Sequence, residues 1–273
     1  MARTFFKTQD IFVFLAIFPE GVYNNSNLAK AGITMQDIIR TVEIMECDFH
    51  RTLPPKQILE HSLSAILVGI RENGADRDSL YSACGAVWMI THMRFSQSGI
   101  IVPGDTLRFH IGPRMIESGR YLFHADVFRG EEQVIQFACS LVPVHKQERH
   151  IVRLSLVEPI WKTPPASGDM KQLHRLRTPC EFSPCGNDTI RMSDCDINHH
   201  MTSGAYLSLA CDALDYWDGP PERYMKMMQI DYSSEVLPGT LLSFERGEAD
   251  GAKFVRGVKP DGKIAFTAEC RFD

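Results

Sequence analysis

The sequence predicts an α+β fold built twice in tandem, in which two antiparallel sheets each wrap around one long central helix and join side by side as a pseudo-dimer. In each half of the 273-residue chain, a stretch with helical apolar spacing is followed by several segments of alternating apolar and polar residues. Short matching motifs also recur in the same order in both halves, which is typical of an internal duplication. With 44% hydrophobic residues, the chain can build a substantial core.

The first half is expected to span residues 39–144. An alternating segment at 41–50 indicates a strand, and Pro54 and Pro55 are tolerated in the first turn of the helix that follows. Asn73-Gly74 ends this helix. Its buried face consists of residues at helical spacing, namely Leu59, Leu63, Ile66, Leu67 and Ile70. Turns that contain glycine separate four further strand signals, at 81–96, 105–116, 119–129 and 132–143.

Residues 145–178 are rich in proline and charge and have no sustained periodicity, so they are predicted to be a linker. The second half, 179–273, repeats the plan of the first. A strand signal at 189–192 precedes a helix whose spacing is set by Tyr206, Leu209, Ala210, Ala213 and Trp217. The repeat is visible in matched pairs: Cys47-Asp48 corresponds to Cys195-Asp196, and Pro103-Gly104 corresponds to Pro238-Gly239.

Residues 1–38 are expected to be an N-terminal extension of unknown role. Their apolar run at 11–18 is shorter than the about 20 residues that a membrane-spanning helix needs, so no membrane span is predicted. The run also lacks the small-residue cleavage site of a signal peptide. Met35 is an alternative initiator, which would leave residues 1–34 untranslated.

The charge balance and the cysteines exclude several classes of function. A net charge of −5 argues against nucleic acid as the main partner, because the chain as a whole would not neutralise a phosphate backbone. The eight cysteines form no C-x-x-C pair, which favours reduced thiols and a cytoplasmic protein over a disulfide framework or a zinc ribbon. We therefore expect neither a metal nor another cofactor.

Ionisable and amide side chains are densest between Ser193 and Tyr206, on the predicted turn between a strand and a helix. The N-terminus of a helix offers unpaired N–H groups and about half a positive charge, so it can bind a developing oxyanion while nearby side chains move protons. The cluster therefore suits acyl chemistry. The alternative is a helix cap that serves stability alone, with Asp196 as the N-cap and Asn198 as a turn former.

The cluster allows two further interpretations. Cys195 could act as a nucleophile, but an incidental buried thiol is the favoured interpretation. His199 and His200 are adjacent and point apart on a helix or a strand, and no third ligand recurs at metal spacing, so a zinc site is disfavoured.

Three motifs together resemble the acyl-acyl-carrier-protein thioesterases, the plant and bacterial double hot-dog enzymes that end fatty-acid chain growth. The signature D-x-N-x-H is present at residues 196–200 and leads into a helix with Tyr206. Residues 230–235 resemble the strand of this family that ends in a catalytic glutamate, here Glu235, and Trp88 resembles the tryptophan that opens a strand of the first half. The resemblance covers roughly residues 41–273.

The chain departs from the family in two places. Val236 stands where the plant enzymes have a cysteine after the glutamate, which argues against a cysteine nucleophile there. Thr202-Ser203 replaces a pair of asparagines after the histidine, which leaves the hydrogen bonds at the helix start open.

The resemblance implies a tandem hot-dog thioester hydrolase with its catalytic residues in the second half. Glu235 is the expected base for a water that His200 or Asn198 also holds, and Asp196 is expected to orient the loop. The N–H groups near Met201 and Thr202 are the expected oxyanion donors. Trp88 and Tyr206 are expected to contact the substrate, and the first half is expected to shape the acyl pocket.

The resemblance also implies acyl carrier protein as the partner. The predicted linker holds seven Lys or Arg against three acids, so Arg175 and Arg177 are candidates for docking this acidic protein. A solvated linker that merely needs charge is the equal alternative. Acyl-coenzyme A hydrolysis and an acyl-binding hot-dog protein without turnover are the alternative functions, whereas hydration or dehydration of the acyl chain is expected to need a different arrangement of acid and histidine. Chain-length preference and assembly, including a homodimer, are left open.

Overall fold

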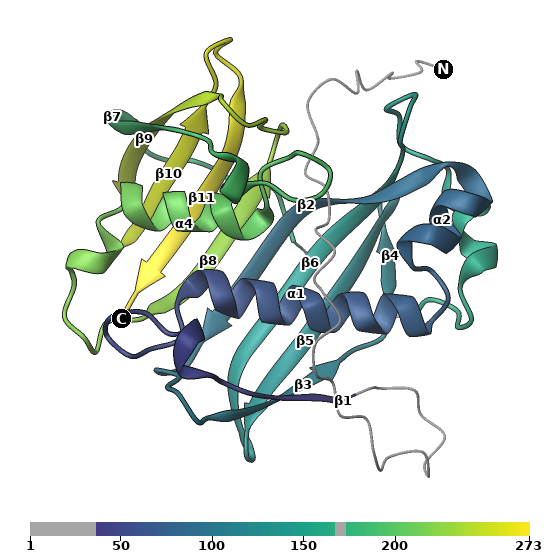
Figure 1. The fold of residues 1–273 in the computed structure, drawn as a ribbon, viewed down its shortest axis with the longest axis horizontal. Coiled ribbons are helices and arrows are strands. Elements are labelled where there is room, and N and C mark those ends of the chain that lie inside the picture. The colour runs from purple at the N-terminus through teal and green to yellow at the C-terminus, as the bar shows by residue number, and fades with distance from the viewer. Residues whose placement is uncertain (1–36, 167–172) are drawn as a thin grey trace.

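The computed structural model describes residues 37–166 and 173–273. Eleven strands are present in this part of the chain: β1 (Asp37–Thr41), β2 (Ala86–Gln97), β3 (Thr106–Ile111), β4 (Met115–Glu117), β5 (Arg120–Arg129), β6 (Glu132–His145), β7 (Ser183–Thr189), β8 (Met225–Tyr232), β9 (Leu241–Ala249), β10 (Ala252–Val258) and β11 (Ile264–Phe272). They form one sheet in the order β1-β3-β5-β6-β2-β8-β11-β10-β9-β7, and β4 pairs with β5 outside this path. All the pairings are antiparallel (Figure 1).

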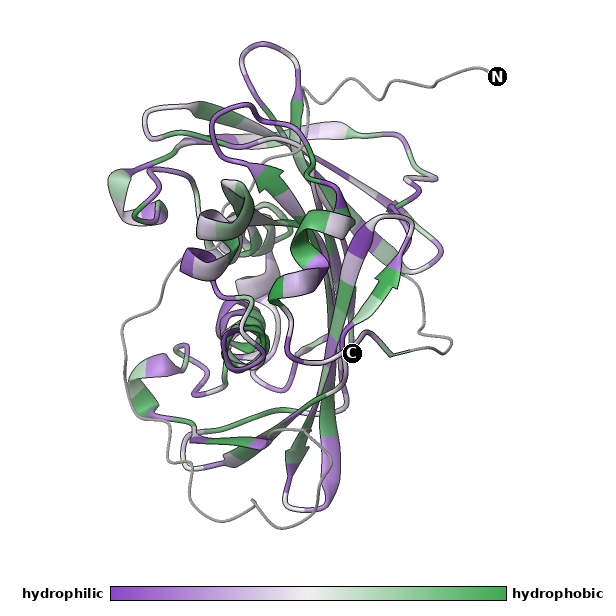
Figure 2. Cartoon of the chain, turned by 90° about the vertical axis from the view of Figure 1, so that its right-hand side faces the viewer, coloured by the Kyte–Doolittle hydropathy of each residue, from purple (hydrophilic) through white to green (hydrophobic). Residues whose placement is uncertain are grey.

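Two helices pack against one face of this sheet and form the core with it. The helices of the described residues are α1 (Pro55–Glu72), α2 (Arg77–Cys84), α3 (Leu154–Val157) and α4 (Ser203–Ala213), with short 3₁₀ segments η1 (Ile44–Glu46), η2 (Glu158–Ile160), η3 (Met192–Asp194) and η4 (Tyr216–Asp218). Helix α1 lies across the strands of the first half and α4 across those of the second (Figure 1). The view along the sheet places both helices on the same side of it (Figure 2). Each half of the sheet therefore covers one central helix, as the sequence predicts.

Helix α1 follows its sequence pattern closely. Pro55 occupies the first helical position and Gly74, with a φ of 86°, follows the end. The apolar face predicted from helical spacing is buried at Leu59, Leu63 and Ile70. The helix is thus fixed by the burial of one face against the first half of the sheet.

The two halves join through β2 and β8. These strands pair antiparallel from His92↔Asp231 to Ser96↔Met227, so the sheet runs across the boundary without a break. One cluster of buried apolar side chains contains residues of both halves, including Phe95 and Phe266. The predicted pseudo-dimer, a double hot-dog fold, is confirmed.

The internal duplication extends to the backbone hydrogen bonds of two turns. In residues 48–52 and 196–200, the N–H of the first residue donates to the carbonyl of the fifth, over 2.9 Å in both turns. The fourth residue of each turn, Arg51 or His199, has a left-handed φ, of 62° and 61°. The first-half turn is therefore a structural copy of the D-x-N-x-H turn.

A second pair of matching hydrogen bonds aligns the glutamate of the second half with a residue of the first. Leu53 donates its N–H to the carbonyl of Ile101 over 2.8 Å, and Met201 donates to Val236 over 2.9 Å. Glu235 therefore corresponds to Ile100, which precedes Ile101 in the sequence. The first half repeats the backbone and lacks the carboxylate.

Several expected strands are wrong or misplaced. The strand expected at 41–50 is β1 at residues 37–41 followed by η1, and the signal at 189–192 contains only the end of β7. Residues 81–84 belong to α2, because Asp76 caps this helix by accepting hydrogen bonds from the N–H groups of Asp78 and Ser79. The strand expected at 105–116 divides into β3 and β4.

The predicted linker is folded over much of its described length. Val152 and Val157 are buried in the core, and Arg114 lies over the ring of Trp161 at 4.4 Å. Arg114 also makes two hydrogen bonds of 3.0 Å to Glu158. This stretch therefore packs on the first half through side chains whose spacing follows no regular period. Most of the expected extension, residues 1–36, including the candidate initiator Met35, lies outside the described residues.

Candidate active site

His200 and Glu235 form the centre of the predicted cluster. The Nε2 atom of His200 lies 3.0 Å from Oε2 of Glu235. His200 ends the turn that leads into α4, and Glu235 lies three residues beyond the end of β8. The hydrogen bond from Met201 N–H to the Val236 carbonyl, 2.9 Å long, joins the two segments directly beside these side chains. The structure thus brings together two residues that are 35 positions apart in the sequence.

Asp196 holds Asn198 by two hydrogen bonds. One carboxylate oxygen of Asp196 accepts from the backbone N–H of Asn198 over 2.7 Å, and the other accepts from its side-chain amide over 3.2 Å. This is the pattern of an Asx turn, in which a short side chain replaces a backbone acceptor. The Asp196 carboxylate is therefore engaged in orienting Asn198, as expected for an aspartate that shapes the loop.

Arg149 also contacts Glu235, and sequence reasoning grouped it only with the other linker cations. Its Nη2 atom donates to Oε2 of Glu235 over 2.5 Å. Strands β6 and β8 are both antiparallel to β2, so their C-terminal ends lie at the same edge of the sheet. Arg149 follows β6 and Glu235 follows β8, which is why these two residues meet here. Only the order of the strands in the sheet could have predicted this contact, and a single sequence does not give that order.

The partners of Glu235 decide its charge. Burial alone would raise the pKa of this carboxyl, but the hydrogen bonds and charges of His200 and Arg149 outweigh burial and lower the pKa below its ordinary value. The side chain is 26% exposed, so solvent reaches it. Glu235 is therefore a carboxylate at neutral pH and can accept a proton.

The expected oxyanion donors need correction. The N–H of Met201 donates to the Val236 carbonyl and the N–H of Thr202 donates to the Asp194 carbonyl, each over 2.9 Å. Neither is available to a substrate. The side chain of Thr202 caps α4 by accepting from Ala205 N–H over 3.1 Å. The N–H groups at the start of α4 that have no acceptor within residues 37–166 and 173–273 are instead those of Ser203 and Gly204, which are both buried.

The two expected substrate contacts, Trp88 and Tyr206, are core residues in this structure. Trp88 is buried, and its indole N–H donates to the Ala75 carbonyl over 2.8 Å. Tyr206 is fully buried, and its hydroxyl donates to the Ser234 carbonyl over 3.3 Å. Tyr206 thereby fixes the loop that carries Glu235. Contact of either residue with a substrate stays a prediction.

Cys195 lies beside the site with its thiol protonated. Burial, followed by the charges of Asp194 and Asp196, raises the pKa of this thiol. Its Sγ donates to the Arg191 carbonyl over 3.4 Å. These contacts argue against a thiolate nucleophile at this position. No group of three His, Cys, Asp or Glu that could hold a metal ion occurs in the described part of the chain.

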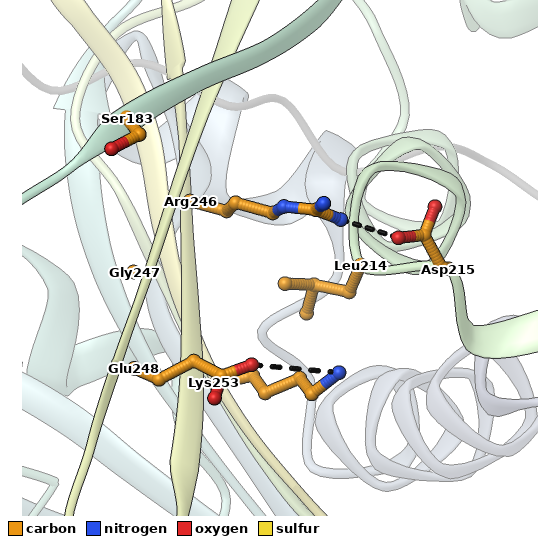
Figure 3. A pocket seen from close by; sticks show the side chains of 7 residues that line it. All are labelled: Ser183, Leu214, Asp215, Arg246, Gly247, Glu248 and Lys253. Atoms are coloured by element: carbon orange, nitrogen blue, oxygen red, sulfur yellow. Dashed lines mark hydrogen bonds and ion pairs between the residues drawn. The ribbon is translucent and has the colours of Figure 1, made fainter.

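A separate charged pocket lies at the other end of α4. It has a volume of about 330 Å³ and is lined by Ser183, Leu214, Asp215, Arg246, Gly247, Glu248 and Lys253 (Figure 3). Arg246 pairs with Asp215, and Lys253 lies 3.6 Å from Glu248. Leu214 follows the last residue of α4, whereas His200 precedes the first, so the pocket is distinct from the His200–Glu235 pair.

Comparisons with known proteins place the fold. No family model matches the sequence, and no curated protein matches it. An acyl-ACP thioesterase from Bacteroides thetaiotaomicron superposes with a TM-score of 0.72 at 16% identity, over 88% of this chain and 98% of that one. A 12:0-ACP thioesterase from Umbellularia californica superposes with a TM-score of 0.69 at 15% identity, over 88% of this chain and 97% of that one. A MaoC-like dehydratase from Phytophthora capsici superposes with a TM-score of 0.50 at 14% identity, over 68% of this chain and 72% of that one. The fold is shared with these enzymes, and its members differ in chemistry.

Proposed function

We propose that this protein hydrolyses the thioester of fatty acyl-acyl carrier protein, releasing a free fatty acid and the carrier thiol. The observation that carries the proposal is the ionised Glu235 held by His200 beside the first turn of α4, where the N–H groups of Ser203 and Gly204 have no acceptor among the described residues. The shared fold with two acyl-ACP thioesterases supports the choice of substrate. A role in fatty acid biosynthesis and a cytoplasmic location belong to this proposal. No helix among the described residues has the length and apolar character needed to cross a membrane.

The proposed reaction needs one water and no covalent enzyme intermediate. Both partners that Glu235 has among the described residues contact Oε2, which leaves Oε1 for a water. Glu235 takes a proton from this water while its oxygen attacks the thioester carbonyl carbon. The carbonyl oxygen becomes an oxyanion, which the N–H groups of Ser203 and Gly204 and the positive end of α4 stabilise. The C–S bond then breaks, and the proton on Glu235 passes to the leaving sulfur.

His200 and Asn198 have supporting roles in this scheme. His200 fixes the position of the Glu235 carboxylate by its 3.0 Å contact. Asn198, held by Asp196, presents its amide on the same turn and can hold the substrate carbonyl or the water. All four residues expected from the sequence therefore keep a role, although Asp196 acts through Asn198.

The test is release of free thiol from acyl-carrier and acyl-coenzyme A thioesters of varied chain length. Wild-type protein is expected to prefer the carrier substrates, and His200→Ala and Glu235→Gln are expected to lose about 10²- to 10⁴-fold in kcat. Equal rates with both substrate classes would favour an acyl-coenzyme A thioesterase. Release from no thioester would overturn hydrolysis and favour an acyl-binding protein.

Docking of the carrier is a second part of the proposal. The N–H of Leu176 donates to Asp231 Oδ2 over 2.6 Å, which fixes the segment to the sheet while the neighbouring Arg175 and Arg177 are exposed. Reversing both arginines to Glu is expected to raise the KM for acyl carriers but not for small thioesters, because the carrier is acidic. Lys259→Glu, in the exposed turn between β10 and β11, is the matched control. An equal rise in KM for small thioesters would contradict docking.

A further inference from the structure

We propose that Arg149 is a positioning residue of this site, which fixes the Glu235 carboxylate so that Oε1 faces the attacking water. The inference rests on the proposed thioester hydrolysis and assigns a residue from the loop that follows the first half to a site whose other members belong to the second. Arg149 would act through Glu235, without contact to the reacting atoms.

The geometry assigns the two oxygens of Glu235 different tasks. Arg149 Nη2 and His200 Nε2 lie 2.5 Å and 3.0 Å from the same oxygen, Oε2. Two donors on one oxygen fix both the position and the rotation of a carboxylate group. The side chains of Arg149 and Glu235 are 32% and 26% exposed, so water can reach this pair.

The loop that carries Arg149 is held in place by its own hydrogen bonds. The N–H of His145 donates to the His150 carbonyl over 2.9 Å, and the N–H of Arg149 donates to the His145 carbonyl over 2.8 Å. Arg149 has a φ of 59°, a left-handed conformation that is uncommon for residues other than glycine. The surrounding contacts therefore maintain a backbone conformation that directs this side chain across the boundary between the halves.

A second anchor ties the same loop to the start of β2. The N–H of Lys146 donates to the Gly85 carbonyl over 2.9 Å. A Cβ atom at position 85 would lie 2.6 Å from Nε2 of His145, so a glycine is needed for this close approach. The loop is thus attached to the central strand on which both halves meet, and Arg149 is presented from a rigid support.

The charge of Arg149 has a consequence that a purely structural contact would lack. Burial raises the pKa of Glu235, and the positive partners His200 and Arg149 counter it. Removing the guanidinium removes one of these partners, so the pKa of Glu235 rises. The pH at which the base becomes protonated then rises as well, and the acid limb of the kcat profile moves to higher pH.

The experiment compares Arg149→Gln and Arg149→Lys with wild type on a small acyl thioester. Arg149→Gln is expected to lower kcat by about 10- to 100-fold with little change in KM, and to move the acid limb to higher pH. Arg149→Lys is expected to restore the acid limb but only part of kcat, because an ammonium group keeps the charge and not the planar fork. Arg153→Gln, an exposed arginine at the N-cap of α3, is the matched control and should behave as wild type.

Two measurements separate this inference from other outcomes. In a Glu235→Gln background, Arg149→Gln is expected to cause no further loss of kcat, because both changes act on one group. A ¹³C NMR titration of the glutamate carboxyls is expected to show a raised Glu235 pKa in Arg149→Gln without any substrate.

Hydrolysis by wild type, together with an unshifted Glu235 pKa and an unchanged kcat in Arg149→Gln, would overturn this inference and leave the proposed function intact. An increase in KM confined to carrier substrates would also overturn it, in favour of a docking role. No hydrolysis by wild type would overturn the proposed function and, with it, the assignment.

Discussion

Asp196 and its counterpart Asp48 have nearly the same surroundings, yet only one belongs to the candidate site. Asp48 Oδ1 accepts hydrogen bonds of 3.0 Å from the N–H groups of His50 and Thr52, and Asp196 Oδ1 accepts from Asn198. We expect Asp48→Ala and Asp196→Ala to lower the free energy of unfolding by a similar amount, about 1 kcal/mol, because each removes the acceptor of an equivalent turn. Only Asp196→Ala should lower kcat, by about 10- to 100-fold. Urea unfolding and thiol release measure the two effects, and an equal kcat loss in both variants would contradict the assignment.

The lowered pKa of Glu235 predicts a pH dependence of stability. A carboxyl whose pKa is lower in the folded state stabilises the fold above its unfolded pKa, and this contribution is lost as pH falls through the folded pKa. We therefore expect Glu235→Gln to be less stable than wild type at neutral pH and to approach it as the pH falls below about 4.5, the ordinary value for Glu. Chemical denaturation at a series of pH values checks this. A constant difference across the series would argue against an ionised, paired Glu235.

At the scale of residues, the sequence predicted the members of the candidate site better than their contacts. Asp196, Asn198, His200 and Glu235 were recognised because their types and spacing form a motif. Arg149 was missed because only the strand order brings it to Glu235. The donors Met201 and Thr202 were wrong because their N–H groups bind carbonyls whose positions depend on the folded loops.

The contact between α1 and α4 depends on Gly204. A Cβ atom at position 204 would lie 2.1 Å from Oε1 of Glu60, which is on α1. Burial raises the pKa of Glu60, while Lys56, 4.0 Å away, acts in the opposite direction. The glycine therefore makes room for a carboxyl of the first half against the first turn of the second-half helix.

This contact predicts coupling between the two positions. Replacing glycine by alanine inside a helix ordinarily adds about 1 kcal/mol of stability. We expect Gly204→Ala to show this gain in a Glu60→Ala background but to lose it in the wild-type background, where the carboxyl must move. A double-mutant cycle by urea unfolding should give a coupling of about 0.5–3 kcal/mol. Additive effects would show that Glu60 adjusts freely and that the glycine is not required.

Elements with a strong apolar period were predicted well, and short ones were not. Helix α1 combines a clear apolar face with end signals on both sides, and β5 and β6 alternate between turns that contain glycine. Helix α2 has eight residues and one buried side chain, Leu80, so it has no clear apolar period. Its last residues were therefore predicted as the start of the neighbouring strand β2. Strand β1 is an edge strand of five residues whose start precedes the expected domain.

The whole molecule is joined at the pairing of β2 with β8, and a buried polar group lies at this joint. His92 Nδ1 lies 2.9 Å from Asp231 Oδ1, and Asp231 is only 3% exposed. The other oxygen of Asp231 accepts from Leu176, and Gln229 donates to the His174 carbonyl over 2.6 Å. The central strands and the connecting segment are thus held by a shared set of hydrogen bonds.

Asp231→Ala is expected to release the segment around Leu176, which connects the two halves. The loss of the acceptor for Leu176 and His92 should lower the free energy of unfolding by about 1–3 kcal/mol, and the released segment should be cleaved faster by trypsin after Arg175 and Arg177. Limited proteolysis with identification of the cleaved bond measures this directly. Glu131→Ala, in the exposed turn between β5 and β6, is the control. An unchanged cleavage rate at both arginines would show that the segment is held by other contacts.

The duplication made the architecture predictable from one sequence. Matched motifs in the same order specified two copies of one plan, and their hydrogen bonds coincide in the structure. The residues between the copies were harder to predict, because Trp161 and its neighbours pack through individual contacts without a period. The comparison of the two halves predicts only the parts of the chain that are duplicated, and this segment has no second copy.

The joining of both halves in one chain also determines how the site responds to dilution. Arg149 directly follows the last strand of the first half and Glu235 belongs to the second half, so in an assembly of two separate chains their contact would depend on a dissociation constant. Here the covalent connection keeps the effective concentration of each half around the other high at any protein concentration. The contact therefore persists in single, isolated molecules, and the rate per molecule should be the same at nanomolar and micromolar protein.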